Sequence, residues 1–341
     1  MSVARHKSWT KLPDEQLLQQ RFCDLHLSLR GTRVARAIKK LRGELLARRI
    51  RFAPHVWLAD EWFTPDGVAG FAVPFYLAHP RLERLERQML GKVEGANMNW
   101  LMRILRHETG HALDNACGLR RRKIWRDTFG PATLPYPSRY RARPGSRRYV
   151  HHLGEWYAQA HPAEDFAETF AVWLQPRSGW RRNYADWPAL NKLRVVDALM
   201  QNVSCRKLAV SNRQKIEPLD EDQRTLAQHY LARAQQQIRY RRGQTDLLLR
   251  RIFGDAPARK GVASAAALLR GAKPQLARYL MRTGKVDRYT AFQILRVTIE
   301  RAAHLQLWVR GTQRDSLRQV RWLLLRVLAT YSRSRSPLFN L

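Results

Sequence analysis

The sequence is poor in cysteine and contains no long apolar run. Its three cysteines, Cys23, Cys117 and Cys205, are far apart and odd in number, which argues against a disulfide framework and against a paired-cysteine zinc knuckle. Cysteines used so sparingly are typical of a reducing compartment, and we therefore expect a cytoplasmic protein. Residues 1–13 hold no apolar stretch of signal-peptide length, and no segment approaches the roughly 18 uninterrupted apolar residues of a membrane span.

Acidic residues are also scarce, since 62 Lys and Arg stand against 28 Asp and Glu, and the formal net charge is +34. Such a positive field admits nucleic acid, an anionic membrane surface or an acidic polypeptide as a partner. The basic residues are spread over both halves of the chain, which argues against a discrete nucleic-acid-binding arm, and no nucleic-acid-binding motif is evident. The alternative interpretation is that the arginines only keep the protein soluble.

The chain has 341 residues, enough for two domains of ordinary size or one large one, and 45% of them are hydrophobic, enough for at least one core. Helical periodicity predicts helices within residues 14–50. Residues 55–63 and 68–77 are instead rich in aromatic and β-branched residues and predict a small sheet within 55–78. The turn signal at 64–67 is expected to join its strands, and Pro74 in the second run points to an edge strand.

Helices are predicted again over residues 97–117, 150–158 and 162–174. The first of these has an apolar stripe, and Gly118 is typical of the residue that ends a helix. From residue 206 the chain is predicted to be helical to its end, with arginines interleaved among Leu, Trp and Tyr. We therefore place one domain at 1–205 and a basic helical domain at 206–341.

One motif carries chemistry: His107 and Glu108 are followed by Thr, Gly and then His111. Residues four apart share one face of a helix, so the two imidazoles can hold a single metal ion. Neutral imidazole suits zinc, and a catalytic zinc needs three protein ligands and a water molecule. Glu108 is placed to take a proton from that water as general base.

A third metal ligand is required, and the sequence offers a glutamate on a second helix. The scheme with a glycine three residues and a ligand six residues after His111 fails, because Asp114 and Cys117 occupy those positions. Glu164 and Glu168 share one face of the predicted helix 162–174, and buried carboxylates need a cationic partner. Glu164 would bind the metal, and Glu168 would accept an N–H from a ligand histidine.

Three further histidines stay open as alternatives to Glu164 or as groups that stabilise an oxyanion. They are His151, His152 and His161, and no helical spacing links them to the HExxH pair. Cys117 lies less than two helical turns after His111, and we interpret it as a small apolar residue rather than a ligand or nucleophile.

Together, HExxH and the later Glu-Asp-Phe-Ala-Glu-Thr-Phe at 164–170 resemble the gluzincin clan of zinc metallopeptidases. The motifs are similar to those of the anthrax lethal factor catalytic domain and, more closely, to those of the bacterial family described as putative zinc-binding metallopeptidases. The resemblance covers residues 55–200. It implies that Tyr157, seven residues before the ligand glutamate, donates a hydrogen bond to the oxyanion. It also implies that substrate adds as a strand to an edge, for which 68–77 is the candidate.

The sequence therefore predicts an α+β, mostly helical protein, with a zincin-like domain containing a small sheet and an all-α basic C-terminal extension. The expected activity is hydrolysis of peptide bonds with one Zn²⁺ per chain, and acidic polypeptides are a candidate substrate class because of the net charge. Two alternatives are a protein that binds nucleic acid or an anionic surface on a zincin-like scaffold, and a structural metal protein without turnover. The last is disfavoured, because a structural site has no need of Glu108.

Overall fold

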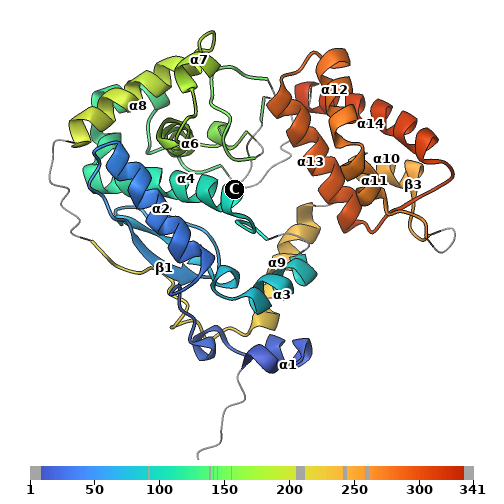
Figure 1. Cartoon of the computed structure of the whole chain (residues 1–341), viewed down its shortest axis with the longest axis horizontal. Helices are drawn as coiled ribbons and strands as arrows, with labels where there is room; N and C mark the ends of the chain where they lie inside the picture. The colour runs from blue at the N-terminus through green and yellow to red at the C-terminus, as the bar shows by residue number, and fades with distance from the viewer. Residues whose placement is uncertain are drawn as a thin grey trace, which may run out of the picture. The chain divides into compact units, whose positions relative to one another are not determined.

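The computed structural model describes residues 9–90, 93–137, 140, 142–143, 145–154, 156–204, 212–240, 244–257 and 261–333. They form two compact units, each assembled from separate stretches of the chain (Figure 1). The first unit takes the chain up to Pro135, then Arg148–Leu153 and His161–Gln235, and the second takes Tyr136–Arg147, Gly154–Ala160 and the chain from Gln236. The predicted boundary at residue 205 lies outside the described residues, and residues 212–235 group with the first unit.

The first unit is built mainly of helices around one short sheet. Its α-helices are α1 (Asp14–Leu18), α2 (Arg33–Ala47), α3 (Pro80–Leu90), α4 (Met98–Cys117), α5 (Lys123–Phe129), α6 (Pro162–Leu174), α7 (Trp180–Asn183), α8 (Ala189–Ser204) and the start of α9 (Leu226–Tyr240). Its 3₁₀ helices are η1 (Trp9–Lys11), η2 (Phe22–Leu25), η3 (Phe75–Ala78) and η4 (Leu119–Arg121). The predicted mostly helical α+β fold class is confirmed.

The sheet of this unit consists of β1 (His55–Ala59) and β2 (Gly70–Pro74), which pair in parallel with His55 opposite Gly70. The turn at 64–67 lies in the connection between the two strands, as predicted, and the parallel pairing means that residues 60–69 carry the chain back to the start of the sheet. Position 70 requires glycine for a steric reason, because a Cβ there would lie 2.1 Å from the carbonyl oxygen of His55.

The implied substrate-binding edge at 68–77 is also not open along its length. All five residues of β2 are buried, and the amide of Ala72 on the side away from β1 donates to the carbonyl of Phe63 at 2.8 Å. Pro74 offers no amide at all. The strand that the sequence assigned to an exposed edge is therefore covered at its centre by the segment that precedes the turn.

The helical prediction for residues 14–50 holds in parts. The chain leaves helical geometry between η2 and α2, where His26 and Gly31 have left-handed φ values of 44° and 75°. Thr32 then caps α2, since its hydroxyl accepts the amide of Ala35 at 3.2 Å. The helix predicted at 150–158 is wrong, because within the described part of that range only the start of the 3₁₀ helix η5 (Tyr157–Gln159) is helical.

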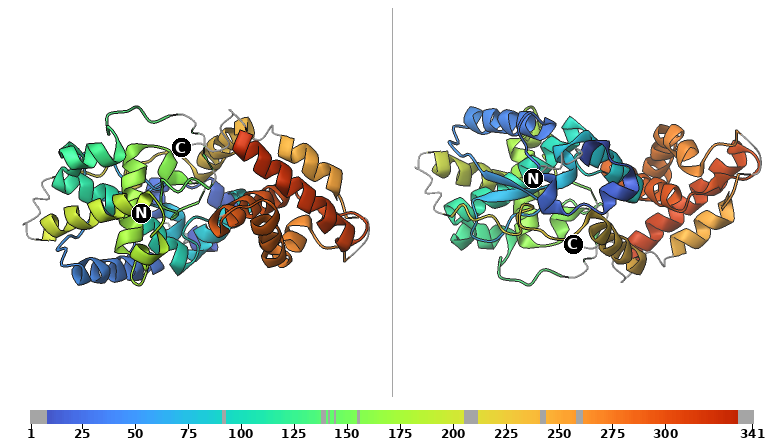
Figure 2. Two further views of the ribbon diagram at one scale, coloured as in Figure 1. Left: turned by 90° about the horizontal axis from the view of Figure 1, so that it is seen from above. Right: turned by 90° about the horizontal axis from the view of Figure 1, so that it is seen from below.

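The second unit has its own apolar core and is almost entirely helical. It contains η5, the end of α9, α10 (Gln244–Ile252), α11 (Ala265–Gly271), α12 (Lys273–Thr283), α13 (Arg288–His304) and α14 (Gln313–Arg333). Figure 2 shows these last helices, coloured orange to red, from above and below. One short antiparallel ladder, β3 (Phe253–Gly254) with β4 (Trp308–Val309), adds two strands to a region that the sequence predicts as all-α. Among the described residues, no helix is long and apolar enough to span a membrane.

Candidate metal centre

Helix α4 presents the HExxH motif in the interior of the first unit. Asn97 caps its N-terminus by accepting the amide of Trp100 at 2.9 Å. Gly118 ends it in the left-handed conformation, with φ of 58°, as the sequence predicts. Every residue of the motif is buried, and His107 and His111 lie one turn apart on the same face.

Helix α6 brings the second set of polar groups into the same interior. His161 caps it by accepting the amide of Ala163 at 3.2 Å, and Pro162 occupies the first turn. Every residue from Ala163 to Leu174 is buried, which is typical of a helix surrounded by other elements. Its carboxylates therefore need partners inside the protein.

Helices α4 and α6 cross and pack closely against each other, and Gly110 makes this close packing possible (Figure 1). A Cβ on Gly110 would lie 3.0 Å from the Cα of Ala167 and 3.2 Å from Cδ1 of Phe170. Ala167 lies between Glu164 and Glu168, so the close approach sits beside both carboxylates. The glycine inside the HExxH motif thus sets the distance between the histidine pair and the facing helix.

The two imidazoles and one carboxylate converge on a common point. Glu164 Oε2 lies 3.0 Å from Nε2 of His107 and 3.2 Å from Nε2 of His111, and the two Nε2 atoms are 3.2 Å apart. Ligands at about 2.0–2.1 Å from a tetrahedral zinc ion stand about 3.4 Å from each other. The triangle of donor atoms therefore fits such an ion after small adjustments, and all three residues are buried.

Burial and charge act against each other at Glu164. Burial alone would raise the pKa of this carboxyl, but the neighbouring imidazoles of His111 and His107 lower it well below its usual value. Glu164 is therefore a carboxylate over the physiological range, which is the form that binds a metal ion.

Glu168 lies one turn further along α6 and holds His107 from the other side of the ring. Its Oε1 is 2.9 Å from Nδ1 of His107, and its Oε2 accepts the amide of Leu153 at 2.8 Å. Burial raises the pKa of Glu168, but these hydrogen bonds and the nearby His152 outweigh it and the pKa is lowered. Because Glu168 is an ionised acceptor, Nδ1 of His107 carries a proton, so Nε2 is the ring atom that faces Glu164 and that binds a metal once it has released its own proton.

Glu108 is buried on the face of α4 next to the histidines, and one of its oxygens is already engaged. The hydroxyl of Thr64 donates to Glu108 Oε2 at 2.8 Å. Thr64 begins the turn that precedes β2, so this contact joins two regions far apart in the sequence. The turn signal was visible in the sequence, but nothing in the sequence indicated that it lies against Glu108.

The structure assigns other contacts to the three alternative histidines. His161 caps α6 and donates from Nε2 to the carbonyl of Leu134 at 2.9 Å. His152 donates from Nε2 to the carbonyl of Arg103 at 3.0 Å, and burial lowers its pKa to about 4, so it is neutral near pH 7. His151 packs edge-on against Trp187. None of the three belongs to the group of possible metal ligands found among the described residues.

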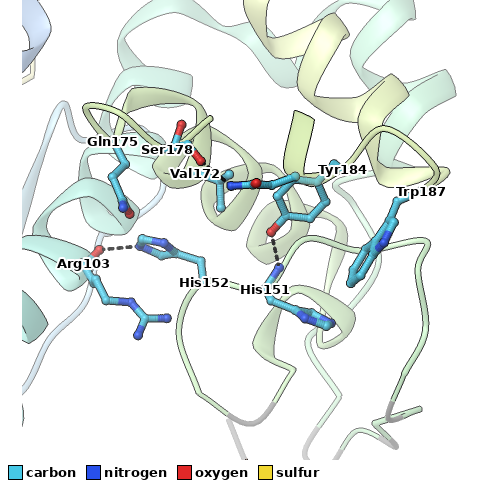
Figure 3. Close-up of a pocket in the computed structure, with 9 residues that line it drawn as sticks. Arg103, His151, His152, Val172, Gln175, Ser178, Tyr184 and Trp187 are labelled. Atoms are coloured by element: carbon cyan, nitrogen blue, oxygen red, sulfur yellow. Dashed lines mark hydrogen bonds between the residues drawn. The ribbon is translucent and has the colours of Figure 1, made fainter. Parts of the chain in front are cut away.

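A cavity of about 390 Å³ lies in the first unit, and none of His107, Glu108, His111 and Glu164 lines it (Figure 3). It contacts α4 at Arg103, one turn before His107, and α6 at Val172, one turn after Glu168. The described residues of the lining include no Asp or Glu; they are Arg103, His151, His152, Val172, Gln175, Ser178, Asn183, Tyr184 and Trp187.

The structure assigns Tyr157 to the second unit and Cys117 to the end of α4. Tyr157 starts η5 and belongs to the second unit, where its ring packs edge-on against Tyr140 with 6.5 Å between ring centroids. Its role as oxyanion donor stays a prediction. Cys117 is the last residue of α4 and is half-buried.

A comparison with protein families gives one finding. Residues 87–183 match the model of the family described as putative zinc-binding metallo-peptidase, and this segment contains α4 and α6 with all three converging residues. No curated protein and no solved structure matches the chain. The match spans well under half of the 341 residues, and His107, His111 and Glu164 lie inside the region that is similar to this family.

Proposed function

We propose that this protein is a zinc-dependent peptidase of the gluzincin type, with His107, His111 and Glu164 as metal ligands and Glu108 as general base. The observation that carries the proposal is the triangle of donor atoms, with edges of 3.0–3.2 Å, in the interior of the segment that is similar to zinc-binding peptidases. Two imidazoles and one carboxylate form a donor set suited to catalytic zinc.

His107, His111 and Glu164 would hold the zinc ion, and when bound it would supply Lewis acidity to a water molecule and to a peptide carbonyl. Glu108 accepts a proton from this water molecule as the oxygen of the water attacks the carbonyl carbon. Glu108 then gives the proton to the leaving amine as the C–N bond breaks. Glu168 keeps the proton on Nδ1 of His107 throughout, and Tyr157 is proposed to donate a hydrogen bond to the oxyanion.

Acidic polypeptides are the substrate class that we favour, for two reasons. The net charge of +34 attracts them, and the described residues that line the cavity include Arg103 and no Asp or Glu. Peptide libraries with acidic or basic residues flanking the cleaved bond test this preference. Faster cleavage of the acidic library, reduced by Arg103→Gln, supports it, and equal cleavage of both libraries contradicts it.

The catalytic proposal is tested with Glu108→Gln and His111→Ala beside the wild type. Glu108→Gln removes the base and leaves the ligands in place, so it should keep zinc and lose about 10²–10⁴-fold in kcat. His111→Ala should lose both zinc and activity. Wild-type turnover in Glu108→Gln would refute the assignment of the general base.

A further inference from the structure

A side chain outside the HExxH motif contacts the carboxylate that the proposed reaction uses. The hydroxyl of Thr64 lies 2.8 Å from Glu108 Oε2 and donates to it. The carboxylate of Glu108 has two oxygens, and this bond engages one of them. A charge-assisted hydrogen bond of this kind is directional and stronger than a neutral one.

Thr64 is held from both sides by backbone and side-chain contacts of its turn. Before it, the carbonyl of Phe63 accepts the amide of Ala72 on β2 at 2.8 Å. After it, Asn115 on α4 donates to the carbonyls of Pro65 and Val68 at 2.8 Å and 2.9 Å. The hydroxyl is therefore fixed in place by the fold rather than carried on a free loop.

The spacing of residues on α4 explains why the chain turn at 64–67 can contact both Glu108 and Asn115. Asn115 follows Glu108 by seven residues, which is close to two full helical turns, so both side chains lie on the same face. The turn runs along this face, with Pro65 and Val68 bonded to Asn115 and Thr64 at Glu108. Arg120 adds a further link, since it bonds both Asp114 and Asp66.

We propose that Thr64 is a positioning residue for the general base, and that Asn115 holds the turn which carries it. The proposal rests on the proposed function. By occupying Oε2, the hydroxyl limits rotation of the Glu108 carboxylate and leaves Oε1 as the oxygen that accepts the proton from water. A carboxylate fixed before the reaction does not have to be ordered during it, so the contribution is to kcat rather than to substrate binding.

Thr64→Val removes the hydroxyl with almost no change of shape, and Thr64→Ser restores it. The matched control is Thr128→Val on α5, which removes a hydroxyl that donates within its own helix, to the carbonyl of Ile124. Each variant is compared with wild type for zinc per chain, for kcat and KM on a peptide, and for the dissociation constant of acetohydroxamate. Acetohydroxamate chelates zinc as an anion, and the proton that it gives up on binding is shared with Glu108. Its dissociation constant therefore reports on the position of Glu108 without any turnover.

Thr64→Val should keep its zinc, lose about 10- to 100-fold in kcat with KM within about twofold, and bind acetohydroxamate about tenfold more weakly. Thr64→Ser should return to within about threefold of wild type in both measurements. Thr128→Val should match wild type. The rescue by serine separates a role of the hydroxyl from a general loss of structure.

Wild-type kcat and wild-type hydroxamate affinity in Thr64→Val would overturn the positioning role. Loss of zinc from Thr64→Val would overturn it as well, because Thr64 would then maintain the metal site itself. If the wild type cleaves no peptide, the proposed function fails separately. In that case, the hydroxamate series alone decides whether Thr64 positions Glu108.

Discussion

Gly110 on α4 faces Ala167 on α6 so closely that a Cβ on the glycine would lie 3.0 Å from the Ala167 Cα. This close contact lies where α4 and α6 cross, and there the imidazoles of α4 face the carboxylates of α6. On one side of it stand His107 and His111, and on the other stands Glu164, with its carboxylate 3.0–3.2 Å from both rings. The spacing of the donor atoms thus depends on the absence of one methyl group.

Gly110→Ala is expected to weaken zinc binding about tenfold or more. The new methyl group must push α6 away by a few tenths of an ångström, because the nearest atom is backbone and cannot rotate aside. The Glu164 carboxylate moves with its helix and leaves the position that completes the donor triangle. A zinc dissociation constant from chelator competition measures the effect.

Gly43→Ala is the matched control, because Gly43 also lies inside a helix and a Cβ there meets nothing within 4 Å. Replacing glycine by alanine in an open helical position stabilises a protein by roughly 0.5–1 kcal/mol. Gly43→Ala should therefore raise the melting temperature and leave zinc affinity unchanged. Equal zinc affinity in Gly110→Ala and Gly43→Ala would contradict the role of the close approach.

Glu168→Ala is expected to lower zinc affinity by about 10- to 100-fold without removing a ligand. The substitution deletes the acceptor of His107 Nδ1 and of the Leu153 amide. His107 can then adopt the other tautomer, in which Nε2 carries the proton and cannot bind metal. The same competition experiment measures this, and an unchanged affinity would mean that Glu168 does not orient the ring.

Tyr157→Phe tests the residue that the sequence resemblance assigned to the oxyanion. If the phenol donates this hydrogen bond, kcat should fall about 10²-fold or more while zinc content stays at the wild-type level. Tyr140→Phe, in which the ring that packs against Tyr157 loses its own hydroxyl, is the control. A similar small effect of both substitutions would assign Tyr157 to packing alone.

Asp60 links the segment 212–235 to the rest of the first unit through charge. The imidazole of His229 and the guanidinium of Arg224, 2.9 Å away, lower the pKa of Asp60 to about 2, and partial burial opposes them. The folded-state pKa is thus below the unfolded value of 3.8. Stability from this group is present above about pH 4 and is lost as the pH falls towards 2.

Asp60→Asn is therefore expected to lower the free energy of unfolding by about 1–2 kcal/mol at pH 7, after allowance for solvent screening. At pH 2 the mutant and wild type should differ little. Urea denaturation at both pH values measures this, with Asp127→Asn at the exposed pair with Lys123 as the control. The same deficit at both pH values would rule out the electrostatic explanation.

Local patterns in the sequence were sufficient to predict the two helices of the centre. Residues 162–174 form a helix with the predicted bounds, and the helix predicted at 97–117 begins one residue later. Helical spacing places His107 beside His111, and the scarcity of partners for Glu164 and Glu168 on an apolar helix points to a charged neighbour. These are short-range properties, and side-chain periodicity determines them.

Contacts between distant segments could not be predicted in the same way. Thr64 meets Glu108 only because the turn lies along α4, and the parallel pairing of β1 with β2 depends on how residues 60–69 return. The sequence shows Gly110 as a glycine in a helix, but the steric reason for a glycine there is the close approach of Ala167 on α6. The sequence likewise could not distinguish a helix cap from a metal ligand at His161, since a buried imidazole suits both roles.

The most direct measurement is elemental analysis of the purified protein, wild type beside Glu164→Ala and Glu83→Ala, a glutamate of α3 that pairs with Arg33. The account predicts one zinc per chain in the wild type and in Glu83→Ala, and loss of that zinc in Glu164→Ala, because two imidazoles alone hold it weakly. A wild type without zinc, or a Glu164→Ala variant that keeps a full equivalent, would contradict the proposed centre.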